Sequence, residues 1–223
     1  MDCRRTIRVT GKGLIKVRPD QTRITVTLEE KYPEYADALY HSSRDTDDLK
    51  QILSREGFEK KDLKTLSFDI DAEYEGYHED GIYRQKLIGY RYRHVMKVDF
   101  DSDSERMGRV LYALAHGSLT PEIQISYTVK DREAAKNRLL GKAVEDARQK
   151  AEFLAEASGV TLGSLINVNY SWSEPNFEVR PMNRALMGAN GAAPMAKASG
   201  YDLNLEPDDL ELSDTVTLTY EID

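Results

Sequence analysis

The sequence predicts an α+β fold of antiparallel-rich sheets with helices packed on one face. Several segments alternate apolar and polar residues with the period of two that is typical of a strand with one buried face. Residues 23–29 show this most clearly, with Ile24, Val26 and Leu28 on one side. Such one-sided alternation favours antiparallel pairing over a doubly wound parallel sheet. Longer segments between the strands carry apolar residues at helical spacing.

The composition is that of a globular protein. The chain has 223 residues, of which 40% are hydrophobic and 31% charged, and this length allows a sizeable core. Its formal net charge of −8 disfavours binding to nucleic acid and to anionic membranes. We see no apolar run at the N-terminus or elsewhere that could act as a signal sequence or transmembrane segment. As written, the chain is therefore expected in the cytoplasm, or in the periplasm or at the cell surface if a leader was removed.

The first half, residues 1–100, predicts a βαββ-like unit. A strand around Ile7 and Val9 is followed by a β-turn at residues 11–13 and a short strand at 14–17. After the strand at 23–29, a helix is expected over 35–56, with an apolar stripe of Leu39, Leu49, Ile52 and Leu53. A hairpin follows with its turn near 78–82. Its inward residues are expected to be Leu66, Phe68, Ile70 and Ala72 on one arm and Ile88, Tyr90, Tyr92, His94, Met96, Val98 and Phe100 on the other.

The second half, residues 101–223, predicts an αβαββ-like unit. Ser102 and Glu105 form a capping box at the start of a helix, and the stripe of that helix is Met107, Val110, Leu111 and Leu114. A strand at 123–129 leads to an alanine-rich helix over 132–158, whose apolar stripe is expected to be Leu140, Val144, Ala147, Ala151, Leu154 and Ser158. Strands at 166–172 and 216–222 complete a single domain of two fused halves.

No catalytic or metal-binding motif is complete in this sequence. Gly11-Lys12-Gly13 lacks the third glycine of a dinucleotide fingerprint and the Gly-Lys-Ser/Thr of a P-loop, so a turn is expected there. His94 lies among apolar residues, as a hydrogen-bonded core histidine does. His78-Glu79-Asp80 falls on a turn. No serine occupies a Gly-x-Ser-x-Gly elbow, and Cys3, the sole cysteine, is next to the terminus. No cofactor or metal is expected.

The tyrosines and arginines of the hairpin raise the question of nucleic-acid binding. Aromatic and basic side chains together can hold single strands. Here, however, Asp69 and Asp71 are expected opposite Arg91 and Arg93 on the outer face, as a solvated charge ladder. No nucleic-acid partner is therefore expected.

The segment 174–200 has neither helical nor strand periodicity. It is rich in proline, glycine and alanine and contains Met182, Met187 and Met195. One interpretation is a disordered insertion. The other is a flexible apolar arm that orders against a neighbouring subunit, because methionine adapts to irregular surfaces. On the second interpretation, oligomer or partner contacts are expected at Trp172, Met182, Met187 and Met195.

Several blocks of the chain resemble the SIMPL-domain family. These are Ile7-Arg8-Val9-Thr10-Gly11-Lys12-Gly13, then Val17-Arg18-Pro19-Asp20 with the strand that follows, Gly89-Tyr90, Lys150-Ala151, Leu154-Ala155 and Gly159-Val160-Thr161-Leu162-Gly163. The resemblance implies a non-enzymatic fold of βαββ and αβαββ units. It also implies relatives that form ring- or channel-like homo-oligomers in the bacterial periplasm or at the cell surface, have links to oxidative stress, and include an animal protein that binds a kinase.

These observations favour a homo-oligomeric or partner-binding protein without catalysis. Two alternatives stay open. The first is a hydrolase-like enzyme that uses His94 or the residues around His78. The second is a small-ligand or peptide-binding module that uses the tyrosine-rich face of the sheet, for which an open concave pocket would be the mark.

Overall fold

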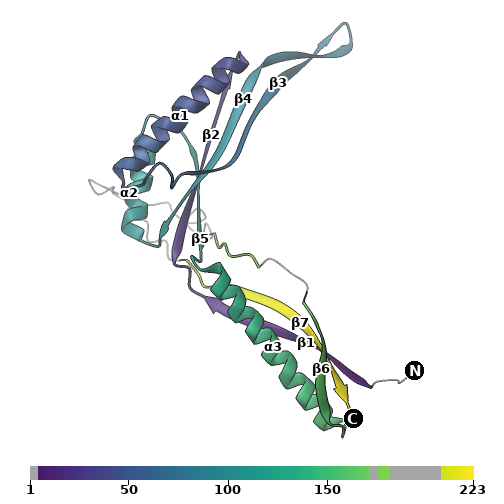
Figure 1. The fold of residues 1–223 in the computed structure, drawn as a ribbon. Coiled ribbons are helices and arrows are strands. Elements are labelled where there is room, and N and C mark those ends of the chain that lie inside the picture. The colour runs from purple at the N-terminus through teal and green to yellow at the C-terminus, as the bar shows by residue number, and fades with distance from the viewer. Residues whose placement is uncertain (1–4, 171–174, 181–206) are drawn as a thin grey trace, which may run out of the picture. The chain divides into compact units, whose positions relative to one another are not determined.

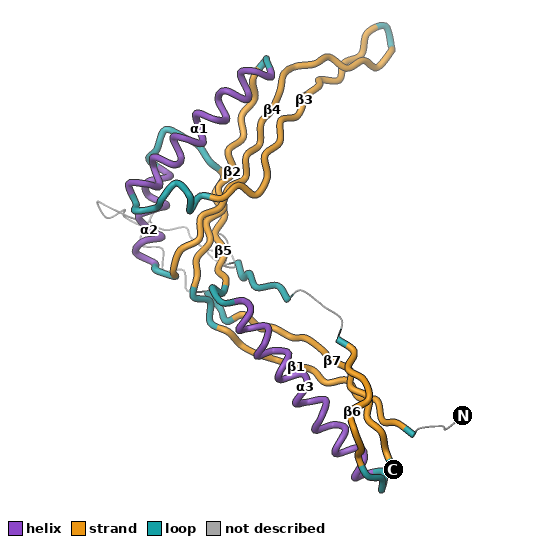
Figure 2. Tube along the Cα trace, viewed as in Figure 1, coloured by secondary structure: helices purple, strands orange, loops and turns teal. Residues whose placement is uncertain are grey.

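The computed structural model describes residues 5–170, 175–180 and 207–223 (Figures 1 and 2). Within these residues, three helices alternate with strands in an α+β arrangement, which confirms the predicted fold class. The elements are β1 Thr6–Val17, β2 Gln21–Tyr32, α1 Tyr35–Arg55, β3 Lys64–Glu79, β4 Ile82–Asp101, α2 Ser104–Ala115, β5 Glu122–Thr128, α3 Arg132–Ala157, β6 Leu162–Asn169 and β7 Leu210–Ile222.

The chain folds into two compact units that interleave along the sequence. Unit 1 comprises Met1–Pro19, Thr128–Val179 and Pro207–Asp223, and unit 2 comprises Asp20–Tyr127 and Arg180–Glu206. The predicted halves 1–100 and 101–223 follow the order of elements along the chain, whereas the compact units group these elements by contact.

Unit 2 is built from β2, α1, β3, β4, α2 and β5, with the strand order β3-β4-β2-β5. This is the element order and strand order of the ferredoxin-like split βαβ arrangement. Residues 24–28 of β2 and 92–100 of β4 alternate as the sequence predicts and bury every second side chain. The predicted stripe of α2 is buried as well: Met107, Val110, Leu111 and Leu114.

Unit 1 is a three-stranded sheet, in the order β1-β7-β6, covered by α3. The helix buries a row of mostly small residues at every fourth position: Ala135, Leu139, Ala143, Ala147, Ala151 and Ala155. Figure 2 shows α3 running along the sheet of unit 1. A Cβ atom on Gly11 would lie 2.1 Å from the Ala143 carbonyl oxygen, and one on Gly13 would lie 2.2 Å from that of Leu139. The helix therefore approaches β1 more closely than any larger residue at these two positions allows.

The β-turn expected at residues 11–13 is wrong, because β1 continues through it as one strand from Thr6 to Val17. Gly11 and Gly13 lie where a helix approaches the strand closely. Glycine inside a strand can indicate such an approach as well as a turn. The stripe expected for α3 is also displaced. Ala147 and Ala151 are buried, but Val144 and Leu154 are exposed, since the contact face follows the alanines.

Three other predictions need correction. Leu39 of the α1 stripe is exposed. On the hairpin, Leu66, Phe68, Ala72 and Ile88 are exposed as well, because β3 is an edge strand and the far part of the hairpin has no helix over it. The N-cap of α2 is Asp103, whose carboxylate accepts hydrogen bonds from the amides of Glu105 and Arg106. Ser102 therefore does not form the predicted capping box.

Candidate functional site

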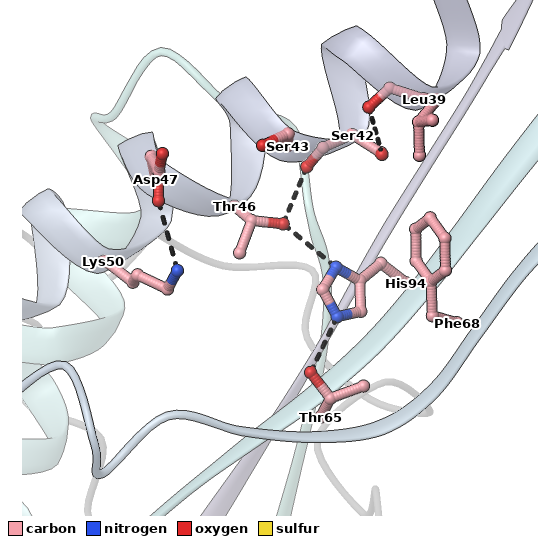
Figure 3. A pocket seen from close by; sticks show the side chains of 9 residues that line it. All are labelled: Leu39, Ser42, Ser43, Thr46, Asp47, Lys50, Thr65, Phe68 and His94. Carbon is pink, nitrogen blue, oxygen red and sulfur yellow. Dashed lines mark hydrogen bonds and ion pairs between the residues drawn. The ribbon is translucent and has the colours of Figure 1, made fainter. Parts of the chain in front are cut away.

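A pocket with a volume of about 340 Å³ lies in unit 2 between α1 and the strands β3 and β4 (Figure 3). Helix α1 lines it with residues three and four apart on one face, and the edge strand β3 supplies an aromatic wall. The lining residues are Leu39, Ser42, Ser43, Thr46, Asp47, Lys50, Thr65, Phe68 and His94. Its size falls within the range of small-molecule sites.

His94 lies at the inner end of this pocket with both ring nitrogens hydrogen-bonded. Nδ1 lies 3.0 Å from the Thr46 hydroxyl and Nε2 lies 2.9 Å from the Thr65 hydroxyl. Thr46 donates its own proton to the Ser42 carbonyl over 2.7 Å, so it accepts from His94. The imidazole is then protonated on Nδ1, and Nε2 accepts from Thr65. The expectation of a hydrogen-bonded core histidine is confirmed.

The electrostatic environment keeps His94 neutral. Burial lowers the pKa of its imidazole, and the nearby Lys50 ammonium lowers it further. The two carboxylates of α1 that flank Thr46 in the sequence have other partners. Asp45 accepts from the Tyr92 hydroxyl at 2.6 Å, and Asp47 pairs with Lys50 at 3.1 Å. His94 therefore lacks the carboxylate that orients a catalytic histidine in a triad.

The chemistry of this pocket is that of a binding site more than that of a catalytic one. Phe68 meets the imidazole edge-on, with ring centroids 5.1 Å apart, and supplies an apolar wall. Thr65 is exposed, and its hydroxyl donates to Nε2 of His94. This hydrogen bond polarises the Thr65 hydroxyl and makes it the group of the pocket that comes nearest to a nucleophile. Without a carboxylate behind the histidine, the pair resembles an incomplete dyad.

The hairpin formed by β3 and β4 carries the other sequence candidates. Its turn is Asp80-Gly81, so of His78-Glu79-Asp80 only Asp80 lies on the turn. His78 and Glu79, expected on the turn, are the last paired residues of β3, and all three residues are exposed. Asp69 pairs in register with Arg93, and Asp71 pairs with Arg91, which confirms their predicted opposition.

The ion pairs of the hairpin arginines are made mostly with glutamates. Arg91 contacts Glu29 at 2.8 Å and Glu73 at 2.9 Å, and Arg84 contacts Glu79 at 3.0 Å. These guanidinium groups are thus neutralised within the protein. The predicted ladder therefore has the expected register, but the ion pairs given for its arginines are with Glu29 and Glu73 and not with Asp69 and Asp71.

The described residues contain neither a cluster of potential metal ligands nor a membrane-spanning helix. No group of three or more histidine, cysteine, aspartate or glutamate side chains comes together there in a way that could hold a metal ion. None of the described helices is both long and apolar enough to cross a membrane.

The predicted contact residues Trp172, Met182, Met187 and Met195, like Cys3, lie outside the described residues. Of the predicted insertion 174–200, the structure describes residues 175–180. There Phe177 is buried against Ile15, Leu139 and Leu212 in unit 1, so this part of the segment packs on the core.

Two exposed apolar surfaces were not foreseen from the sequence. The first is the outer part of the hairpin, where Tyr74, Tyr77, Ile82, Tyr83, Leu87 and Ile88 are exposed. The second is β6, where Leu165, Ile166 and Val168 are exposed. A signal for the second was present in the sequence, because residues 162–169 contain no charged side chain.

Comparison with known proteins places this architecture in a family. The family model SIMPL, described as "Protein of unknown function (DUF541)", matches residues 7–220. The chain belongs to the SIMPL family. The "Uncharacterized protein YggE" of Edwardsiella ictaluri (strain 93-146) is 24% identical over 193 residues, which are 86% of this chain and 78% of that protein. The "26 kDa periplasmic immunogenic protein" of Brucella abortus (strain S19) is 22% identical over 165 residues, 73% of this chain and 65% of that protein.

Proposed function

We propose that this SIMPL protein acts without catalysis, by assembling with copies of itself or by binding a protein partner. The observation that carries this proposal is the exposed apolar side chains of the β3–β4 hairpin beyond the part that α1 covers (Figure 1). Large apolar clusters of this kind on a protein surface mark sites of protein–protein contact. The hairpin is two-stranded along this length, and such ribbons are marginal in water unless something packs on them.

The hairpin is built as a defined element. Asp80 and Gly81 both have positive φ at the two-residue turn, which matches the twist that favours tight hairpins. Arg84 and Glu79 bridge the two arms beside this turn, and Tyr83 lies over Gly76 on the opposite arm. An ordered ribbon that presents aliphatic and tyrosine side chains suits a subunit interface.

Sedimentation velocity over a range of micromolar concentrations tests the proposal. We expect a mass well above the monomer mass of 25.4 kDa. The double variant Ile82→Ser, Leu87→Ser should shift the distribution toward monomer. The control Tyr35→Ser, Tyr40→Ser removes two exposed aromatic rings from α1 and should leave it unchanged. A monomer at every concentration would refute self-assembly, and a hairpin variant that assembles like the parent would refute the role of the hairpin.

The cellular setting that we propose is the periplasm or the cell surface. The Brucella abortus relative carries the word periplasmic in its name, and the family resemblance suggests a role in oxidative-stress tolerance. Cell fractionation with an antibody against the native protein tests the location. Survival of a deletion strain in peroxide tests the role: wild-type survival would argue against it.

A second candidate function is the binding of a small ligand in the His94 pocket. The supporting observation is a concave site of about 340 Å³ that is open to solvent beside the exposed side chains of Phe68 and Leu39. A screen for hydrolase activity and ligand binding, with and without divalent metals, separates this candidate from assembly. Activity that His94→Ala abolishes while the protein stays folded would show catalysis and overturn the non-enzymatic proposal.

A further inference from the structure

Among the residues that the structure describes, none covers the part of the core face of unit 1 that β6 forms. Leu165 pairs with Tyr220 and Val168 pairs with Leu218, and side chains of paired residues share a face of the sheet. Tyr220 and Leu218 are buried under α3. Leu165 and Val168 on the same face nevertheless remain 48% and 53% exposed. The apolar surface that α3 covers on β1 and β7 therefore continues beyond the helix onto β6.

The opposite edge of this sheet is capped by the protein itself. The amide of Lys12 on β1 donates to Asp146 of α3 over 2.7 Å, and Lys150 of α3 donates to the Thr10 carbonyl over 3.2 Å. The Lys150 ammonium also pairs with Asp146 at 2.7 Å. The hydrogen bond from Lys150, and to a smaller extent the one from the Lys12 amide, lowers the pKa of the Asp146 carboxyl. Side chains of α3 thus occupy two backbone groups of β1, the Thr10 carbonyl and the Lys12 amide.

Charge also distinguishes the edge strands of the described sheets. β1 carries Arg8, Lys12 and Lys16. In unit 2 the edge strand β5 carries Glu122, and the edge strand β3 carries Lys64, Asp69, Asp71, Glu73, Glu75 and Glu79. Charged residues on an edge are a common protection against pairing with another chain. β6, with the sequence Leu-Gly-Ser-Leu-Ile-Asn-Val-Asn, has none.

We propose that β6 pairs antiparallel with β6 of a second copy of this chain. This inference rests on the proposed self-assembly and names one of its interfaces. An uncharged strand meets an uncharged strand, so neither brings a repulsive or unpaired charge to the contact. The pairing of β6 with β7 shifts register between Leu165 and Asn167, and this irregularity puts Leu165 and Val168 on one face although they are three residues apart. With the new pair centred there, between Ile166 and Asn167, Leu165 of each copy lies opposite Val168 of the other. Because of the two-fold axis, this apolar contact forms twice. The contact uses up the β6 edges of both copies, so no further copy can add to them.

The geometry of the joined sheet follows from that axis. The strand order becomes β1-β7-β6-β6-β7-β1, with both α3 helices on the same face. Antiparallel pairing satisfies the outer backbone groups of β6 on both copies. The capped β1 edges remain at the outside.

Disulfide trapping tests the pairing directly. In a Cys3→Ser background, single cysteines are introduced along β6 from Ser164 to Val168, and the protein is oxidised and run on non-reducing gels. Opposed residues of an antiparallel pair lie within the distance that a disulfide spans. The variants are mixed in pairs before oxidation. We expect covalent dimers to peak in the two mixtures that join opposed residues, Ile166→Cys with Asn167→Cys and Leu165→Cys with Val168→Cys, and to be several-fold fewer in the mixture of Ser164→Cys with Leu165→Cys. The control Lys12→Cys on β1 should stay monomeric on the gel.

Each pattern of results has one meaning. A protein that assembles in sedimentation but gives no β6 cross-links would overturn this inference and leave the proposed function standing. A protein that stays monomeric would overturn both. Cross-links between β6 and β1 cysteines in a mixture of the two variants would show head-to-tail pairing and would equally overturn the two-fold contact.

A charge variant gives a second, independent measurement. Val168→Lys should raise the dissociation constant of the assembly by about tenfold or more, which is about 1.4 kcal/mol, because it places an ammonium against an apolar side chain of the other copy. The matched control is Leu14→Lys on β1, where the parent side chain is 61% exposed. That variant should assemble like the parent, and equal melting temperatures would show that both variants fold. A Val168→Lys protein with unchanged assembly would contradict the proposal.

Discussion

The two compact units cover their sheets in different ways. In unit 1, α3 approaches β1 and β7 through alanine and glycine, without large side chains between helix and strand at the closest points. In unit 2, α1 packs through larger apolar residues and also buries polar ones, among them Ser42 and Asp45. Tyr92 and His94 of β4 bond to polar side chains of α1. Unit 1 is thus held by close approach, and unit 2 by a mixture of apolar packing and buried hydrogen bonds.

This difference explains where each unit leaves apolar surface exposed. Close packing on small residues brings α3 tightly over β1 and β7 and leaves β6 exposed. The polar network of unit 2 leaves few unused groups, since His94, Asp45 and Asp47 all have partners. The exposed apolar surface of unit 2 is the part of the β3–β4 hairpin that lies beyond α1. In both units the exposed part of the sheet, β6 in unit 1 and the outer hairpin in unit 2, is apolar. Exposed apolar surface favours an interface over an active site.

The largest effect is expected from Gly11→Ala in unit 1. Its Cβ atom would lie 2.1 Å from a backbone oxygen and 2.4 Å from the Ala147 nitrogen, so the helix must move away from the sheet. We expect a loss of about 3 kcal/mol or more in the free energy of unfolding, measured by urea denaturation.

The matched control for this variant is Gly141→Ala in α3, where a Cβ atom meets nothing within 4 Å. Alanine should be neutral there or stabilise the helix by up to about 1 kcal/mol. Equal stability of the Gly11→Ala protein and the parent would show that close approach does not hold unit 1.

In unit 2, Tyr92→Phe should cost about 2 kcal/mol. It removes the hydroxyl that donates to Asp45 and leaves a carboxylate that is only 4% exposed short of a partner. Burial and the hydrogen bond to Asp45 raise the pKa of Tyr92, so its hydroxyl is protonated at neutral pH. Tyr170→Phe, which removes a less buried bond to Asp214, should cost less when measured in the same way. The reverse order would break the contrast between the two units.

The N-cap of α2 gives a smaller effect. Asp103→Ala removes a carboxylate that accepts two backbone hydrogen bonds and should cost about 1 kcal/mol. Ser102→Ala should cost much less, since Ser102 is not the cap. Thermal melting of both variants decides between Asp103 and the capping box that the sequence suggested.

The smallest effect is a dependence on pH through His94. Its pKa is lower in the folded protein than the ordinary value of 6.5 because of burial and Lys50. Between that lowered value and pH 6.5 the unfolded chain holds the proton that the folded one has released, so His94 makes the free energy of unfolding rise with pH. The contribution is complete above pH 6.5 and is lost as pH falls. His94→Gln should flatten this part of the profile; an unchanged slope would contradict the neutral, buried assignment.

Periodicity was sufficient to predict most of the elements. The period of two in residues 24–28 and 92–100 depends on local chain geometry, and so does the helical spacing in α2. Strand order and helix placement depend on contacts between distant residues. For this reason the sequence suggests a turn at Gly11 and places Leu39 and Phe68 in the core, whereas both side chains line an open pocket and are exposed. His94 has two hydrogen-bond partners, Thr46 on α1 and Thr65 on β3. A single sequence gives no sign that these residues lie close together.

Sedimentation velocity of the unmodified protein is the most direct test of the central claim. If the apolar hairpin and β6 are interfaces, the protein should sediment as a discrete species larger than the 25.4 kDa monomer throughout the micromolar range. A single monomeric species over that whole range would contradict the account.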